Sequence, residues 1–125
     1  MEFDIPGDVV KQLSPNQRLH WAEKNRRTQS WKQRTYLFWV QAGGKPAPGK
    51  ARISFTQYRG ARGRPVDADN AAASMKACLD GLVGINGLVA DDGPRFVEIG
   101  PVTVIREKQY EAAPFLRVKI EILSG

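Results

Sequence analysis

The chain has 125 residues, of which 42% are hydrophobic and 26% charged, and this composition is typical of one globular domain rather than a disordered or fibrous protein. Cys78 is the only cysteine and no stretch approaches the ~20 apolar residues of a membrane span, which excludes an internal disulfide and predicts no membrane association. The first ten residues lack an apolar run, so we expect no signal peptide and a cytoplasmic location; the net charge of +6 alone names no partner.

The first half of the chain is expected to form a strand, a long helix and a second strand. Residues 3–5 are extended and end at Pro6-Gly7. The segment 14–17 (SPNQ) has the residues of a helix start, although the helix could begin several residues later, with His20 beside it. Nothing breaks a helix over residues 21–41 before the glycines and prolines of 43–48. The expected buried stripe of this helix is Thr28, Trp31, Thr35, Phe38 and Ala42.

The second half is expected to contain one helix and two or three further strands. Residues 51–58 (ARISFTQY) form a strand by β-propensity, and a basic, glycine-containing loop follows at 59–65. A helix is expected over 69–83, with Ala72, Met75, Leu79 and Leu82 buried and Cys78 beside them. Residues 95–106 form either one bulged strand or two short ones, because Pro101 interrupts them, and 116–122 alternate clearly. The pattern predicts one α+β (mixed α/β) domain over residues 1–125, with two main helices on a small mixed sheet.

Basic residues are concentrated in the first half of the chain. Residues 1–66 hold 13 Lys and Arg against 4 Asp and Glu, whereas residues 67–125 hold 6 against 9. Such a basic region suits a polyanion such as nucleic acid, although a solvated helix face would have the same composition. The candidate DNA-binding residues are Arg18, Lys24, Arg26, Arg27, Arg62 and Arg64.

Acidic residues gather between positions 67 and 92. Asp67 and Asp69 lie two apart, so in extended backbone both carboxylates would point the same way and reach one ion. A carboxylate set without His or Cys partners suits Mg²⁺ or Mn²⁺ rather than zinc. Such an ion promotes phosphodiester hydrolysis, and a nearby lysine such as Lys76 would stabilise the extra negative charge of the transition state.

Each of these residues also has a purely structural interpretation. Asp69 is a natural helix cap, and Lys76 with Asp80 forms an ordinary surface pair at i,i+4 spacing. Asp91 and Asp92 suit a turn before a strand. The grouping of these residues and Asp67 within 26 residues, beside a basic half, favours the functional interpretation.

Several of these motifs occur together in one known family. The run Arg64-Pro65-Val66-Asp67-Ala68-Asp69-Asn70, then Lys76, Asp80-Gly81-Leu82, Gly87-Leu88 and Asp91-Asp92, resembles the RusA family of crossover junction endodeoxyribonucleases, carried by phages and prophages. Ser14-Pro15-Asn16 followed by Arg18 is similar to the family's N-terminal pattern, so the resemblance covers roughly residues 14–95.

The resemblance implies a homodimer that binds four-way DNA junctions and cuts symmetrically related strands with Mg²⁺. Asp67 and Asp69 match the first two metal-binding acids, and Asp92 matches the third, with Asp91 as the alternative. Lys76 matches the catalytic lysine, although it lies about one helical turn further from Asn70 than in the family's best-known member. Asn70 and Asp80 are expected to support these residues.

Two other functions remain open from the sequence. In a non-catalytic DNA-binding or regulatory module of a phage, the acids would be structural and binding would need no metal. A nuclease for flaps or replication forks would use the same site on another branched DNA.

Overall fold

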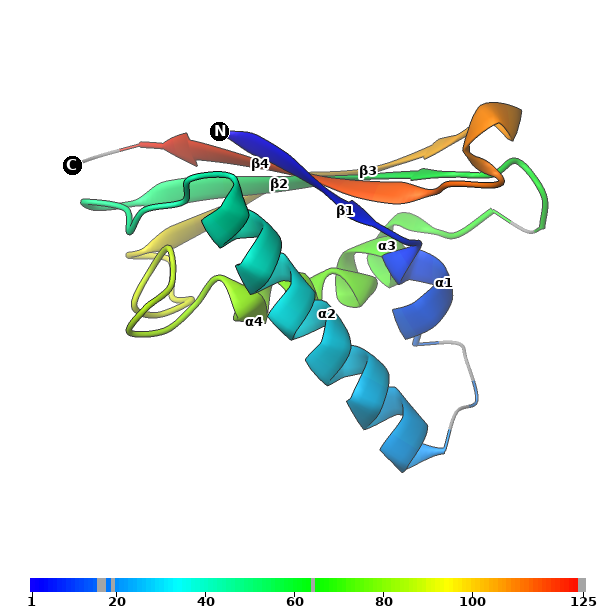
Figure 1. The fold of residues 1–125 in the computed structure, drawn as a ribbon, viewed down its shortest axis with the longest axis horizontal. Helices are drawn as coiled ribbons and strands as arrows, with labels where there is room; N and C mark the ends of the chain where they lie inside the picture. Colours follow the sequence, from blue (N-terminus) through cyan, green and yellow to red (C-terminus); the bar gives the residue numbers. More distant parts are fainter. Residues whose placement is uncertain (16–17, 19, 64, 124–125) are drawn as a thin grey trace.

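The computed structural model describes residues 1–15, 18, 20–63 and 65–123. This part of the chain folds as a single α+β domain with one sheet and several helices (Figure 1). The elements in chain order are β1 (Glu2–Pro6), α1 (Val9–Leu13), α2 (Trp21–Gln41), β2 (Ala51–Arg59), α3 (Ala68–Ser74), α4 (Lys76–Gly81), β3 (Val97–Arg106), a 3-10 turn (Lys108–Tyr110) and β4 (Phe115–Ile122).

The sheet is mixed and has the strand order β1-β4-β2-β3. β4 is antiparallel to both of its neighbours, β1 and β2, whereas β2 and β3 are parallel. A parallel pair requires a crossover connection, which here contains α3 and α4. All four α-helices lie on one face of the sheet (Figure 1), so the mixed sheet covered by helices is confirmed.

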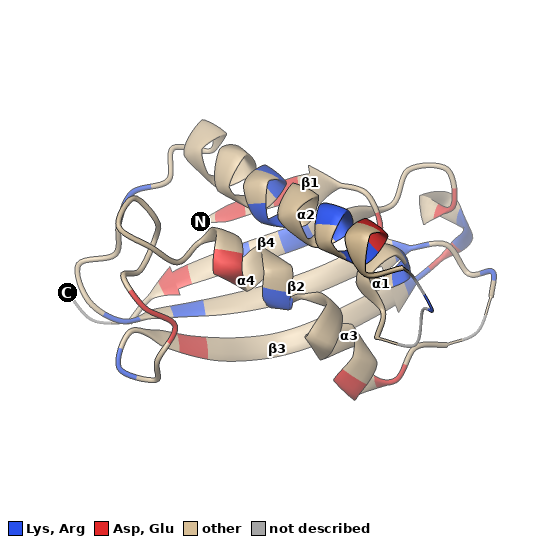
Figure 2. Cartoon of the chain, turned by 90° about the horizontal axis from the view of Figure 1, so that it is seen from below, with Lys and Arg blue, Asp and Glu red and all other residues tan. Residues whose placement is uncertain are grey.

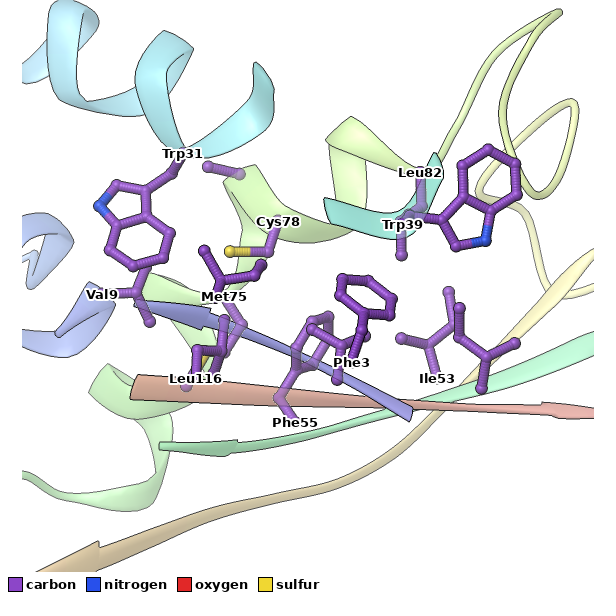
Figure 3. Packing of buried hydrophobic residues seen from close by; sticks show 14 of the residues in the cluster. Phe3, Val9, Trp31, Trp39, Ile53, Phe55, Met75, Cys78, Leu82 and Leu116 are labelled. Carbon is purple, nitrogen blue, oxygen red and sulfur yellow. The ribbon is translucent and has the colours of Figure 1, made fainter. Parts of the chain in front are cut away.

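The hydrophobic core fills the space between the sheet and the helices (Figure 3). The alternation expected in the last strand is confirmed, because Leu116, Val118 and Ile120 are buried while their neighbours face away from the helices. Cys78 is completely buried beside Met75, as expected. The core therefore uses one face of the sheet only, which leaves the other face without a covering layer.

The long helix has the bounds that the sequence predicts, but its buried stripe differs. Trp31, Thr35 and Trp39 are its buried residues, spaced by four, so Trp39 replaces Phe38 and Ala42 in the expected stripe. His20 is the N-cap, and its Nδ1 accepts a hydrogen bond from the backbone N–H of Ala22 at 3.2 Å.

An additional short helix, α1, precedes the long one and was not expected. Ser14 ends α1 as its C-cap and does not begin the long helix, so the helix start expected at residues 14–17 is wrong at this position. Asn16 and Gln17, also part of that expectation, lie outside the described residues. Asp8 caps α1, since its Oδ1 accepts from the backbone N–H of Lys11 at 3.0 Å.

The helix expected over residues 69–83 is divided into α3 and α4. The break is at Met75 (φ −83°, ψ −8°), whose backbone N–H donates to the carbonyl of Ala72 at 3.1 Å, an i→i−3 bond in place of the regular i→i−4 pattern. α4 then packs against α2 so closely that a Cβ on Gly81 would lie 2.3 Å from the carbonyl oxygen of Lys32. The structure thus has one long helix and three short ones in place of the two main helices expected.

β3 is a single strand with an irregularity near Pro101. The register passes from Ile53 opposite Ile99 to Phe55 opposite Val102, so β3 carries one extra residue there. Of the two arrangements left open by the sequence, the structure adopts the bulged strand. Within the described ranges, no helix combines the length and apolar character needed to cross a membrane.

Candidate functional site

Asp67 is the N-cap of α3, and its side chain stabilises the first turn of this helix. Its backbone is extended (φ −70°, ψ 163°), and its Oδ1 accepts a hydrogen bond from the backbone N–H of Asn70 at 2.8 Å. Its Oδ2 accepts from Nδ2 of the same asparagine at 3.2 Å. Asn70 therefore fixes the orientation of the Asp67 carboxylate, as expected of a supporting residue, while the exposed oxygens keep lone pairs for another ligand.

Asp69 lies inside the first turn of α3, and its side chain is exposed. The spacing of Asp67 and Asp69 predicts extended backbone at both residues, with both carboxylates pointing the same way. This placement is wrong for Asp69, because the helix begins at Ala68 and only Asp67 keeps an extended conformation. A carboxylate in the first helical turn is also favoured electrostatically by the helix dipole.

Lys76 lies between two of the predicted acids. Its Nζ is 3.5 Å from Asp80 Oδ1, one turn along α4, and 3.8 Å from Asp92 Oδ2. The side chain of Lys76 is 65% exposed, so water screens both contacts and their contribution to stability is small. The ammonium group is accessible to a ligand, and two carboxylates keep it at the surface of α4.

The segment after α4 brings Asp92 to this position. Residues 82–89 turn back on themselves, with the backbone N–H of Leu88 donating to the carbonyl of Leu82 at 2.8 Å and Val83 bridged to Val89. Asp91 then caps its neighbour, since its Oδ1 accepts from the backbone N–H of Asp92 at 2.7 Å. Of these two aspartates, Asp92 is the one with a contact to Lys76.

The predicted acids fall into two groups along the crossover connection. Asp67 and Asp69 mark the start of α3, while Asp92, which follows Asp91 in the chain, lies beside Lys76 of α4. No group of three or more His, Cys, Asp or Glu side chains comes close enough to hold a metal ion within the described residues. Figure 2 shows that α3 and α4, which carry acidic positions, lie on the same face of the sheet as α2.

The basic candidates on α2 are partly engaged with one glutamate. Glu23 pairs with Arg26 and, at 3.0 Å, with Nε of Arg27. Arg27 also donates to the carbonyl of Gln12 at 3.2 Å, which ties α2 to α1. Arg18 and Lys24 are exposed near the N-terminal end of the helix. Five basic residues against one acid still leave α2 positive (Figure 2).

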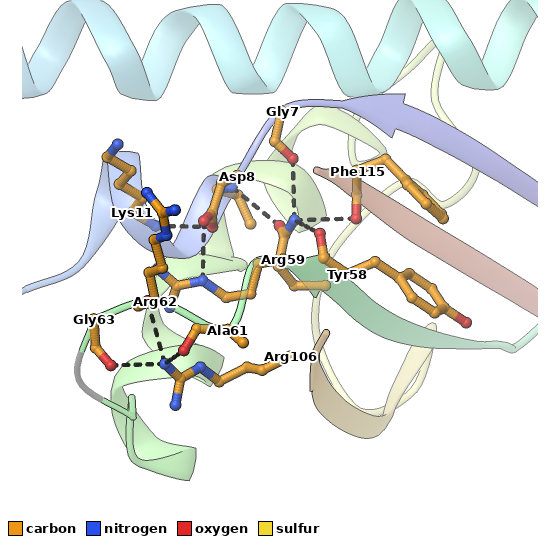
Figure 4. A network of polar contacts seen from close by, with 12 residues as sticks. Gly7, Asp8, Lys11, Tyr58, Arg59, Ala61, Arg62, Gly63, Arg106 and Phe115 are labelled. Carbon is orange, nitrogen blue, oxygen red and sulfur yellow. Dashed lines mark hydrogen bonds and ion pairs between the residues drawn. The ribbon is translucent and has the colours of Figure 1, made fainter. Parts of the chain in front are cut away.

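The basic loop after β2 differs from its expected form. Arg59 is the last residue of β2 rather than a loop residue, and only 13% of its side chain is exposed. Arg62 is exposed on the loop, and Arg64 lies outside the described residues. Sequence reasoning missed Arg106 of β3, whose Nη2 donates to the carbonyls of Ala61, Arg62 and Gly63 and fastens the loop (Figure 4).

Comparison with known proteins does not assign the chain to a family. No family model and no curated protein matches the sequence. The geometry described above is therefore the basis for interpreting the site.

Proposed function

We propose that the chain is a Mg²⁺-dependent endodeoxyribonuclease that acts on branched DNA, and that it resolves Holliday junctions in recombination and repair. The observation that carries the proposal is the position of Lys76 beside Asp92, on the same helical connection that presents Asp67 and Asp69. A lysine among exposed carboxylates is the combination that metal-assisted phosphodiester hydrolysis uses. The resemblance of the 64–92 segment to the RusA family supports the same reaction.

The carboxylate chemistry of the predicted acids suits a magnesium ion. In the structure these acids lie in two separate groups, and no three of the described metal-ligating side chains come together, so a shared ion would have to draw the two groups towards each other. The residues that would hold it are Asp67, Asp69 and Asp92, with Asp91 as an alternative, and all four are exposed carboxylates. When bound, Mg²⁺ supplies Lewis-acid stabilisation of the phosphate and a more acidic water molecule; Mn²⁺ has the same ligand preference. Asn70 orients the Asp67 carboxylate through two hydrogen bonds, which reduces the cost of ordering this ligand.

Lys76 would contribute charge rather than metal ligation. An ammonium group beside the scissile phosphate stabilises the extra negative charge that develops during attack by water. Asp80 and Asp92 contact the ammonium group of Lys76, at 3.5 and 3.8 Å, and so favour one position of the side chain. Asp80 is thus a positioning residue, and its removal should weaken catalysis less than removal of Lys76.

The positive surface of α2 would bind the DNA backbone beside this site. α2 and α4 pack against each other, so DNA lying along α2 passes next to Lys76. Contacts of this kind fix the position of the duplex and carry no base specificity. Arg18, Lys24 and Arg26 are the exposed candidates for these contacts.

A cleavage assay tests the proposal. A labelled mobile four-way junction and a matched linear duplex would be incubated with the protein in Mg²⁺ and in EDTA. We expect paired nicks in the junction alone, lost in EDTA and reduced about a hundredfold or more in Asp69→Asn, which removes a metal ligand. Asp4→Asn is the matched control, because Asp4 pairs with Arg117 on the uncovered face of the sheet.

The outcomes separate the proposed function from its rivals. Junction binding without nicking in Mg²⁺ or Mn²⁺ would contradict the enzyme and favour a DNA-binding module, in which Asp67 is only a helix cap. Cleavage of flaps or forks in preference to junctions would keep the nuclease and change its substrate. Full activity in Asp69→Asn would overturn the assignment of the metal site.

A further inference from the structure

We propose a second anion site on this chain: a pocket at the end of β2 that binds a phosphate group through Arg59 and Arg62. The pocket has a volume of about 360 Å³, within the range of about 300–1,000 Å³ that is usual for ligand sites. Its lining includes Asp8, Lys11, Arg59, Arg62 and Glu111. None of these residues except Arg62 belongs to the candidate nuclease site or its DNA-binding surface.

Arg59 provides the first argument, because its guanidinium is buried but only partly satisfied. Its Nε lies 3.0 Å from Asp8 Oδ2, and the side chains of both residues are less than 15% exposed. Its Nη1 is buried and has no hydrogen-bond partner among the described residues. A buried guanidinium nitrogen without an acceptor is costly, and an oxyanion in the adjoining pocket would satisfy it.

A second unsatisfied guanidinium nitrogen lies on the neighbouring strand. Arg106 is the register partner of Arg59 in the parallel β2–β3 pair, so the two side chains leave the sheet on the same face. Nε of Arg106 is also buried without a partner in the part of the chain that the structure describes. Its Nη2 holds the loop through three carbonyls, at 2.9, 3.2 and 2.7 Å (Figure 4), so the loop that carries Arg62 is fixed in place.

The wall of the pocket is built by a close approach of the backbone. A Cβ on Gly60 would clash with the carboxylate of Glu111 and lie 3.0 Å from Glu111 Cα, so a larger residue would displace the Glu111 side chain and push the two segments slightly apart. The meeting places Glu111 at the rim, where its Oε1 is 3.9 Å from Nε of Arg62. This long and exposed pair is weak, and an incoming anion would compete with Glu111 for Arg62.

The charges of the lining favour a single anionic group. Lys11, Arg59 and Arg62 outnumber the two carboxylates, and Asp8 is already committed to Arg59 and to the backbone N–H of Lys11. Arg59 ends β2, and the next element, α3, has Asp67 as its N-cap, so the pocket and the first predicted acid lie eight residues apart in the chain. We therefore assign the pocket to a backbone phosphate of the bound DNA, a step that rests on the proposed function.

The anion site can be tested without DNA. Inorganic phosphate would be titrated at constant ionic strength, adjusted with chloride, while NMR follows the Nε–H signals of arginine and the amides of residues 60–63. We expect saturable shifts at Arg59 and at these amides. Arg62→Ala should weaken phosphate binding about tenfold, in line with loss of one charge-assisted hydrogen bond, whereas Glu111→Gln should strengthen it.

Lys45→Ala is the matched control, because it removes an exposed positive charge from the connection between α2 and β2, which precedes the end of β2 opposite to Arg59. It should bind phosphate as the unmodified chain does. Absence of saturable shifts would overturn the proposal, and so would equal affinities in Arg62→Ala and Glu111→Gln. Both variants alter exposed side chains, so their folding is not at risk.

A second measurement identifies the source of the phosphate. Junction affinity would be measured by fluorescence anisotropy in EDTA over a range of salt concentrations. If the pocket holds a DNA phosphate, Arg62→Ala and Lys11→Ala each weaken binding and lower the slope of log K against log salt by about one. Phosphate binding with unchanged junction affinity would overturn the DNA assignment. Phosphate binding without any Mg²⁺-dependent cleavage would contradict the nuclease and leave the anion site standing.

Discussion

Individual polar side chains, as well as apolar ones, hold this core together. Gln57 is fully buried in the middle of the domain, where its Oε1 accepts from the backbone N–H of Val9 at 3.0 Å. Its Nε2 donates to the carbonyls of Gly7 and Phe115, each at 3.0 Å (Figure 4). A buried amide satisfied in this way joins the turn after β1 to β2 and β4. It also positions the start of α1, where Asp8 meets Arg59.

The candidate site shows which contacts sequence spacing can predict. Lys76 and Asp80 are four residues apart on a helix, so their contact follows from the helical repeat. The contacts of Lys76 with Asp92 and of Asp8 with Arg59 join distant segments, and no local pattern indicates them. Apart from Arg62, the charged residues that line the anion pocket were missed for the same reason.

Cys78 gives a prediction about alkaline stability. Burial raises the pKa of its thiol from 9.0 to about 12, since the core does not solvate a thiolate. The unfolded chain loses this proton above pH 9 while the folded chain retains it, so the contribution of Cys78 to stability is complete below pH 9 and falls towards pH 12. In urea unfolding, Cys78→Ala should therefore lose less stability than the unmodified chain between pH 9 and pH 11. Parallel pH profiles for the two proteins would contradict this.

Elements with a long repeat were predictable, and short or interrupted ones were not. α2 and β4 have enough residues for their spacing to indicate their type, and the buried face of β4 follows from its alternation, whereas the stripe of α2 shifts to Trp39 in its last turns. α1 has five residues, too few for a helical repeat to be recognised. The break at Met75 has neither proline nor glycine beside it, so the sequence predicts a continuous helix where the structure has α3 and α4.

The position of Asp67 at the start of α3 allows its structural and catalytic roles to be separated. Asn caps a helix as well as Asp does, so Asp67→Asn should keep the free energy of unfolding within about 0.5 kcal/mol, whereas Asp67→Ala should lose about 1 kcal/mol. Both variants lose a carboxylate that would bind Mg²⁺, so both should lose junction cleavage by about a hundredfold or more. Urea unfolding and the cleavage rate measure the two effects. If Asp67→Asn cleaves normally, Asp67 is a cap only.

The molecule as a whole has two different faces. The helix-covered face carries the basic residues of α2 and the acids of α3 and α4 (Figure 2). The uncovered face of the sheet carries ion pairs, such as Arg52 with Glu98 at 2.8 Å and Arg117 with Asp4 at 2.9 Å. Paired charges of this kind form a solvated surface. The proposed functions therefore all lie on the helical side.

The proposed substrate has consequences for assembly. A four-way junction has two-fold symmetry, so a symmetric dimer would present two equivalent sites to it. We expect a homodimer with about twice the 13.9 kDa mass of the chain, measured by light scattering at micromolar concentration without DNA. A monomeric mass under these conditions, and also with a junction bound, would contradict paired cleavage by one assembly.

The central claim is that the two acidic groups of the crossover connection act on one divalent ion beside Lys76. Titration with Mn²⁺ tests it most directly, because the paramagnetic ion broadens the NMR signals of residues close to it. We expect the amide signals of Asp67, Asp69 and Asp92 to broaden together at low Mn²⁺ concentration and to recover in excess Mg²⁺. In the Asp69→Asn variant, Mn²⁺ should broaden the signals of neither acidic group. Broadening of the amide signals in only one of the two acidic groups would contradict a shared metal site. Broadening that excess Mg²⁺ does not reverse, or no broadening at all, would contradict it as well.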